Sequence, residues 1–230
     1  MHTRNSLRRV LAAALEKYPS PDAILMTGDL SQDYSRGAYL AIRELMAHVP
    51  APIYCLPGNH DDPALMAEVL GTDNFHYCEP LRMGNWLLAM LDTWDGDRAG
   101  GLVGTESLAA LDRQLEGNTL PHALVCLHHQ PVPVHCKWLD SVGLDDGDQL
   151  MELISRHPRV RGVLWGHIHQ EFEELRGDVQ LIGSPSTCFQ FLPRQDTFGV
   201  DALPPAYRHV CLHDDGRIES HVLWVDPDPA

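Results

Sequence analysis

Short apolar runs separated by amphipathic segments dominate the first two-thirds of the chain. Five runs are too short for helices of a globular protein and are bounded by polar or turn-forming residues, which predicts buried strands. They lie at residues 23–26, 53–56, 86–91, 123–127 and 160–165. Each run is followed directly by polar residues, so each predicted strand leads into a polar loop.

Between these runs, apolar side chains recur at the spacing of one helical face. In the first such segment Pro19 ends the pattern, and in the third Pro63 occupies the first turn, where proline is well tolerated. The predicted helices cover residues 4–18, 36–49, 63–70, 105–116 and 149–157. The first two-thirds of the chain therefore alternates strand and helix.

The last third of the chain has a different order of predicted elements, with strands and no helices. Four segments predict strands joined by turns such as Arg176-Gly177-Asp178, at residues 171–175, 179–182, 207–212 and 218–225. Residues 192–205 form the one long irregular stretch, and there is no repeat or linker. We expect an α/β (α+β) fold, a two-sheet β-sandwich flanked by helices, in a single domain of residues 1–230 whose last third is mostly antiparallel.

Composition narrows the function classes. The formal net charge of −15 disfavours a nucleic-acid groove and an anionic membrane surface, yet a small phosphorylated molecule could still bind through cations. No apolar run approaches the ~18 residues of a membrane span. The six cysteines form no Cys-x-x-Cys pair, which favours reduced buried thiols in a cytoplasmic protein.

Four strand ends carry the candidate chemistry. They supply one carboxylate, one amide and several imidazoles, from Gly28-Asp29, Gly58-Asn59-His60-Asp61, His128-His129 and Gly166-His167-Ile168-His169. Mixed oxygen and nitrogen ligands suit Fe, Mn, Zn or Co rather than Ca or a thiolate cluster. Such a set can also hold two metals for displacement at phosphorus.

Taken singly, these residues have ordinary explanations. Asp29 and Asn59 are common turn residues, and a pair such as His167 and His169, which point the same way if the backbone is extended, can be a surface feature. Two adjacent histidines after a buried strand are costly without partners. The joint occurrence of all four motifs favours a metal site, and among the other histidines His135, in the loop after His128-His129, is excluded least firmly.

The four motifs, in this order, resemble those of the calcineurin-like metallophosphoesterases over nearly the whole chain. Further segments are similar to the bacterial class III 3′,5′-cyclic-AMP phosphodiesterases, namely residues 128–133, Trp138-Leu139-Asp140, residues 184–188 and Gln190-Phe191. The resemblance implies hydrolysis of cyclic AMP to 5′-AMP by a hydroxide that bridges two divalent metals. Fe or Mn would be the preferred metals, with Zn or Co as alternatives.

The resemblance also implies a role for each residue. Asp29 would bridge both metals, Asn59, His128 and His167 would complete the second metal site, and His169 would belong to the first. His60 would donate a proton or positive charge to the phosphate and be held by Asp61, so that these two form the catalytic pair. Asp29, Asn59, His60 and His169 would contact the substrate, a small cyclic nucleotide, and the protein could form a homodimer.

One family motif is absent. Family members carry an early strand that ends in Asp-x-His and binds the first metal, and this sequence contains no Asp-x-His. The first site would then keep only Asp29 and His169, and β-pairing would leave an open edge. Three explanations compete: an in-frame strand encoded before Met1, a one-metal enzyme, or a non-catalytic scaffold. Another phosphodiesterase or phosphatase on the same scaffold is a further alternative.

Overall fold

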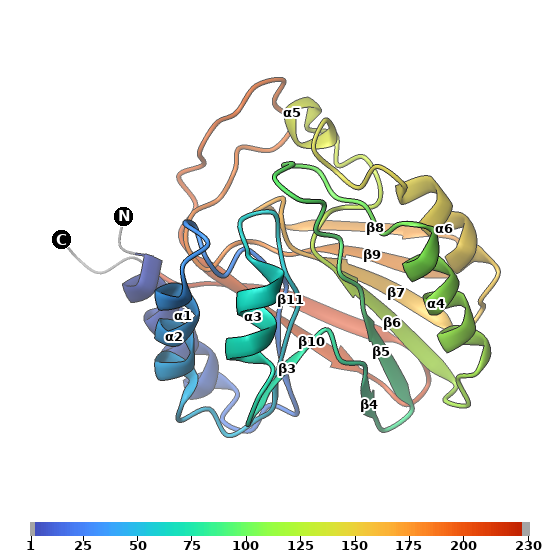
Figure 1. Cartoon of the computed structure of the whole chain (residues 1–230), viewed down its shortest axis with the longest axis horizontal. Coiled ribbons are helices and arrows are strands. Elements are labelled where there is room, and N and C mark those ends of the chain that lie inside the picture. The colour runs from blue at the N-terminus through green and yellow to red at the C-terminus, as the bar shows by residue number, and fades with distance from the viewer. Residues whose placement is uncertain (1–2, 227–230) are drawn as a thin grey trace.

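Two sheets face each other in the computed structural model, with helices on their outer sides (Figure 1). The structure describes residues 3–226, so Met1, His2 and the last four residues of the expected 1–230 domain lie outside the described residues. The helices are α1 (Thr3–Lys17), α2 (Arg36–Met46), α3 (Pro63–Leu70), α4 (Thr105–Glu116), α5 (Lys137–Asp140) and α6 (Gly147–Ser155). The expected α/β fold class, with packed sheets flanked by helices, is confirmed, and a separate β-hairpin accompanies the two larger sheets.

The strands fall into three hydrogen-bonded groups. They are β1 (Ile24–Met26), β2 (Ile53–Cys55), β3 (Phe75–Tyr77), β4 (Leu81–Met83), β5 (Trp86–Met90), β6 (His122–Leu127), β7 (Val160–Trp165), β8 (Phe172–Arg176), β9 (Val179–Gly183), β10 (Ala206–Leu212) and β11 (Ile218–Trp224). The large sheet has the order β4-β5-β6-β7-β9-β8, the small sheet has the order β1-β2-β3, and β10 pairs with β11.

Burial on both faces explains the continuous apolar runs of the central strands. Along β6, Val125 and Leu127 pack in one core with residues of α4 and α6. The alternate residues Leu124 and Cys126 pack in a second core with β2, β5 and β11. Successive side chains of a strand point to opposite faces, so an apolar residue is needed at every position from Ala123 to Leu127.

The small sheet lies under α2 and α3 and is parallel throughout. Among residues 3–226, β1 has a strand neighbour on one side only, which is β2. The open edge expected from the absent motif is therefore present in the described part of the chain. The β10–β11 hairpin joins the inner core through Ile218, and the ring of Tyr18 after α1 stacks on His209 of β10 at 3.7 Å.

The structure differs from the sequence predictions in the last third and in three short elements. The expectation of mostly antiparallel pairing holds for β8–β9 and β10–β11, but β9 also pairs in parallel with β7, which the sequence did not predict. The elements β3, β4 and α5 were not predicted. Each is only three or four residues long, and the two strands are defined by their pairing with β2 and β5 rather than by an apolar pattern of their own.

Candidate metal centre

The four motifs meet because they follow the carboxyl ends of β1, β2, β6 and β7. The strands of each pair are parallel, so their ends lie at the same edge of each sheet, and the two sheets face each other. Asp29 and His128 lie so close to the backbone at position 58 that this residue must be glycine. A Cβ atom on Gly58 would lie 2.2 Å from Oδ1 of Asp29 and 2.7 Å from Cε1 of His128.

His128 lies at the centre of the group. Its Nδ1–H donates to the carbonyl oxygen of Thr27 at 2.6 Å, which leaves Nε2 for a ligand. This Nε2 is 3.3 Å from Oδ1 of Asn59, 3.4 Å from Oδ2 of Asp29 and 3.2 Å from Nδ1 of His167. Two ligands bound ~2.0–2.1 Å from one tetrahedral metal lie roughly 3.3–3.4 Å apart, so these separations fit a shared cation.

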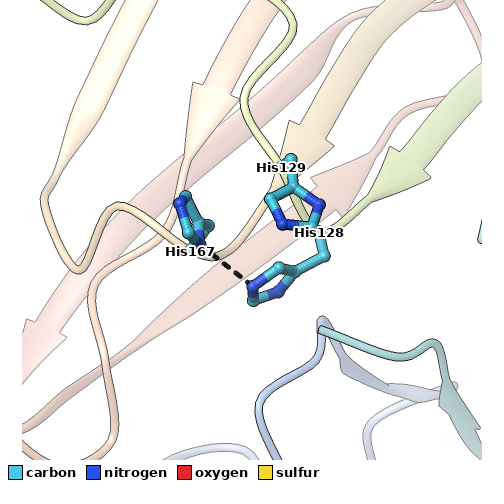
Figure 2. A group of neighbouring side chains, drawn as sticks. All are labelled: His128, His129 and His167. Atoms are coloured by element: carbon cyan, nitrogen blue, oxygen red, sulfur yellow. Dashed lines mark hydrogen bonds between the residues drawn. The ribbon is translucent and has the colours of Figure 1, made fainter. Parts of the chain in front are cut away.

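His129 completes the tightest cluster of potential ligands. Nitrogen atoms of His128, His129 and His167 all lie within 4.8 Å of one another, and all three side chains are buried. Figure 2 shows the three imidazoles beyond the strand ends, with the hydrogen bond between His167 and His128. The ring of His129 is 4.7 Å from that of His167, and its Nδ1 is 2.8 Å from the hydroxyl of Thr93. His129 belongs to one of the four sequence motifs, but no ligand role was predicted for it.

His169 lies beside this cluster with a different set of contacts. Its Nδ1–H donates to the carbonyl oxygen of Phe189 at 3.0 Å, which again leaves Nε2 available. Its ring stacks on Phe191 with centroids 4.3 Å apart and planes 5° apart. The charge of Asp29 acts on its pKa, so the two residues expected to share the first metal are electrostatic neighbours.

Three of the candidate ligands have left-handed backbone conformations. The φ angles are +56° at Asp29, +54° at His167 and +47° at His169. The idea that His167 and His169 share a direction because their backbone is extended is therefore wrong. Non-glycine residues rarely adopt this region, and such strain tends to occur at functional sites, where the surrounding fold holds it in place.

Charges in the site are coupled. Burial alone would raise the pKa of the Asp29 carboxyl, but the neighbouring His128 brings it far below its usual range. Burial alone would lower the pKa of His128, but Asp29 raises it above its ordinary value. Burial and the charge of His128 lower the pKa of His167 to about 3, and burial lowers that of His169 to about 4. His167 and His169 are therefore neutral near pH 7, the form that binds metals.

His60 and Asp61 are placed differently from expectation. The backbone N–H of His60 donates to Oδ1 of Asp29 at 3.0 Å, and its Nδ1 lies 3.2 Å from the amide nitrogen of Gln32. The interpretation that Asp61 holds the His60 ring is wrong. The Asp61 side chain is fully buried and accepts hydrogen bonds from the backbone N–H groups of Leu30, Ser31 and Gly58 and from the hydroxyl of Tyr39. Burial raises the pKa of Asp61, although these N–H groups oppose the effect.

Several supporting residues gave no signal in the sequence. The histidine rings are held by a carbonyl, an amide or a hydroxyl of four residues: Thr27, Gln32, Thr93 and Phe189. Such contacts follow no local sequence pattern. His135 is exposed and lies outside the three-histidine cluster. Within the described part of the chain, no helix combines the length and the apolar character needed to cross a membrane.

Fold and site together define a two-sheet α/β protein with a carboxylate, amide and imidazole centre at its strand ends, a donor set suited to divalent metals. A model of the calcineurin-like phosphoesterase family matches residues 1–171. The chain belongs to this family, and it is therefore a hydrolase of phosphate esters for which divalent metals are the implied cofactors.

Two relatives support this assignment, and a solved structure shares the fold. The chain is 39% identical over 227 residues to a 3′,5′-cyclic adenosine monophosphate phosphodiesterase, CpdA, of Pseudomonas aeruginosa, with 98% of this chain and 83% of the relative covered. It is 35% identical over 214 residues to a 3′,5′-cyclic-nucleotide phosphodiesterase of Nostoc, with 93% and 80% covered. A dimetal phosphatase from Danio rerio shares the fold with a TM-score of 0.66 at 12% identity, with 97% of this chain and 89% of that chain covered.

Proposed function

We propose that this protein hydrolyses 3′,5′-cyclic AMP to 5′-AMP with two divalent metals. One observation carries the proposal: oxygen and nitrogen atoms of Asp29, Asn59 and His167 converge on Nε2 of His128 at 3.2–3.4 Å. The similarity to cyclic-nucleotide phosphodiesterases supports the choice of substrate.

The residues present fit a metal better on one side of the centre than on the other. Asn59, His128 and His167 would hold one metal together with Asp29, and Asp29 and His169 would contribute to the other. Two side chains alone bind a metal weakly, so the second metal would need additional ligands. Fe or Mn, or alternatively Zn or Co, suits this donor set. When bound, the metals would activate water and offset charge on the phosphate.

His60 would supply the proton for the leaving group. If the Gln32 amide donates to Nδ1, the proton of His60 lies on Nε2. As the oxygen of water bonds to phosphorus, the bond to O3′ of the ribose breaks and O3′ takes the proton from Nε2. The ring regains a proton that the attacking water releases, so the net reaction adds one water to cyclic AMP. His60 would thus be a catalytic residue, and Asp61 a positioning residue that holds the loops after β1 and β2 together. Asp29, Asn59, His60 and His169 would contact the substrate.

A direct assay tests the proposal. The purified chain should convert cyclic AMP to 5′-AMP in the presence of Mn²⁺ or Fe²⁺, and EDTA should abolish the reaction. Cleavage of bis(p-nitrophenyl) phosphate with cyclic AMP left intact would refute the substrate and leave the reaction class standing. A protein that binds metal and cleaves neither ester would instead favour the scaffold alternative, since a fold does not fix a function. His48→Ala, at an exposed position of the α2–β2 connection, is the matched control.

The remaining expectations belong to the same proposal. Residues 1–230 would form one phosphoesterase domain that acts on a small cyclic nucleotide, without nucleic-acid or membrane partners. Free thiols are present at Cys55, Cys78, Cys126, Cys136 and Cys211, which suits a reducing cytoplasm. Size-exclusion chromatography with light scattering would test whether the protein is a homodimer.

A further inference from the structure

We propose that an aromatic cluster beside the metal centre, formed by Trp138, Phe189, Phe191 and Phe198, is the platform on which the nucleobase of the substrate stacks. This inference rests on the proposed function and names the part of the substrate that the metal ligands do not contact. It also gives a role to Trp138 and Phe191, which lie in sequence segments that the metal site leaves unexplained.

The cluster is continuous with the metal centre. Phe191 stacks on the candidate ligand His169 at 4.3 Å, and Phe189 lies 5.1 Å from the same imidazole. On its other side, Phe191 lies 4.9 Å from Trp138 and 5.5 Å from Phe198. Trp138 and Phe198 are themselves 5.3 Å apart, so the rings form one connected surface that starts at a metal ligand.

The segments that carry these rings are anchored. The backbone N–H of Phe191 donates to the carbonyl oxygen of His169 at 3.1 Å, and Phe191 forms an antiparallel bridge with Val200. The buried amide of Gln190 donates to the carbonyl oxygens of Ser186 and Pro204. Rings held in this way lose little further freedom when a ligand stacks on them, which favours binding.

The position of Phe198 indicates that the aromatic cluster does more than support the imidazole of His169. Phe191 and Phe189 already contact the imidazole, whereas the ring contacts of Phe198 are with Phe191 and Trp138, and Phe198 remains 62% exposed. An exposed phenylalanine at the edge of an anchored aromatic surface offers a flat apolar face. Nucleobases stack on such faces.

The arrangement matches the shape of a cyclic nucleotide. In 3′,5′-cyclic AMP a single ribose ring separates the phosphate from adenine. In the protein a single phenylalanine ring, Phe191, separates His169 from Phe198. A phosphate at the metal centre therefore leaves the base within reach of the outer rings.

Binding measurements test the stacking of the base independently of catalysis. Calorimetry on the Mn²⁺-loaded protein would compare 5′-AMP with ribose 5-phosphate, which has the same phosphate and sugar but no base. Phe198→Ala should weaken 5′-AMP binding about 5- to 150-fold, the usual effect of losing one stacked ring, and leave ribose 5-phosphate unchanged. Phe198→Tyr should retain binding. Leu175→Ala removes an equally exposed apolar side chain on β8, where Leu175 is 71% exposed, and should change neither ligand.

The outcomes are distinguishable from failure of the proposed function. Equal weakening of both ligands by Phe198→Ala, or no weakening of either, overturns the platform. So does a wild-type protein that binds 5′-AMP no more tightly than ribose 5-phosphate. If 5′-AMP binding depends on Phe198 while cyclic AMP is not cleaved, the platform stands and the proposed reaction fails.

Discussion

His128 donates its Nδ1–H to the carbonyl oxygen of Thr27 at 2.6 Å. This bond fixes the ring so that Nε2 faces Asp29, Asn59 and His167. A carbonyl group only accepts, so the proton must be on Nδ1, and the lone pair of the neutral ring lies on Nε2. The strand end after β1 thus orients a ligand that follows β6, and the site depends on contact between the two sheets.

Replacing His128 or His167 by Ala should lower the affinity for Mn²⁺ or Zn²⁺ at least 100-fold, because each change removes one of few nitrogen ligands. Isothermal titration or competition with a chelating dye measures the affinity. The matched control His48→Ala should bind as the wild type does. Unchanged affinity in either site variant would show that the metal binds elsewhere.

Gly58→Ala should reduce metal affinity although Gly58 itself supplies no ligand atom. The added Cβ would lie 2.2 Å from Oδ1 of Asp29, so the carboxylate must move. Gly37→Ala is the control, because the nearest atom to its Cβ is the hydroxyl of Ser35 at 3.8 Å, and alanine favours the α2 helix. Equal metal affinity in the two variants would mean that the position of Asp29 has no effect on the site.

His60→Ala should lower turnover by ~10²–10⁴-fold, the usual contribution of a general acid, while metal content stays the same. Gln32→Ala should cost less, since it removes only the hydrogen bond that sets the tautomer of His60. Plasma emission measures the metal content, and kcat on cyclic AMP measures the turnover, so a loss of catalysis can be told from a loss of metal. A variant His60→Ala with full turnover would remove this residue from the mechanism.

Asp61→Ala should destabilise the fold more than it changes chemistry. It would leave three backbone N–H groups, two of them buried, and the Tyr39 hydroxyl without their acceptor, at a cost of about 3 kcal/mol or more in the free energy of unfolding. Tyr39→Phe removes one of these bonds and should cost about 1 kcal/mol. Urea unfolding measures both, and equal costs would contradict the assigned network.

Acid should destabilise the metal-free protein. His169, with a pKa of about 4, and His167, with a pKa of about 3, stay neutral in the folded state, whereas both bind protons near pH 6.5 once unfolded. Stability is therefore full above pH 6.5 and falls as the pH drops toward these values, on the order of 3 kcal/mol for His169. The raised pKa of His128 acts in the opposite direction. Thermal unfolding from pH 7 to pH 5 should show a smaller loss of Tm for His169→Gln than for the wild type or His48→Gln, and parallel curves would refute the assignment.

The sequence determined the central strands and the order of the four motifs. A run such as 123–127 is short and apolar at every position, which predicts a strand covered on both faces and places His128-His129 at its carboxyl end. The resemblance to the metallophosphoesterases was also carried by local motifs, and the family assignment confirms it.

Only the tertiary structure decided which atoms meet. Asp29 and His128 are separated by about a hundred residues and come together because two sheets pack face to face, and Asp61 accepts from backbone groups of another loop rather than from its neighbour His60. The parallel pairing of β9 with β7 and the clustering of Trp138 with Phe191 and Phe198 are likewise contacts between distant segments. Periodicity reports which side of an element is buried, but the partner on that side is set by the packing of the whole chain.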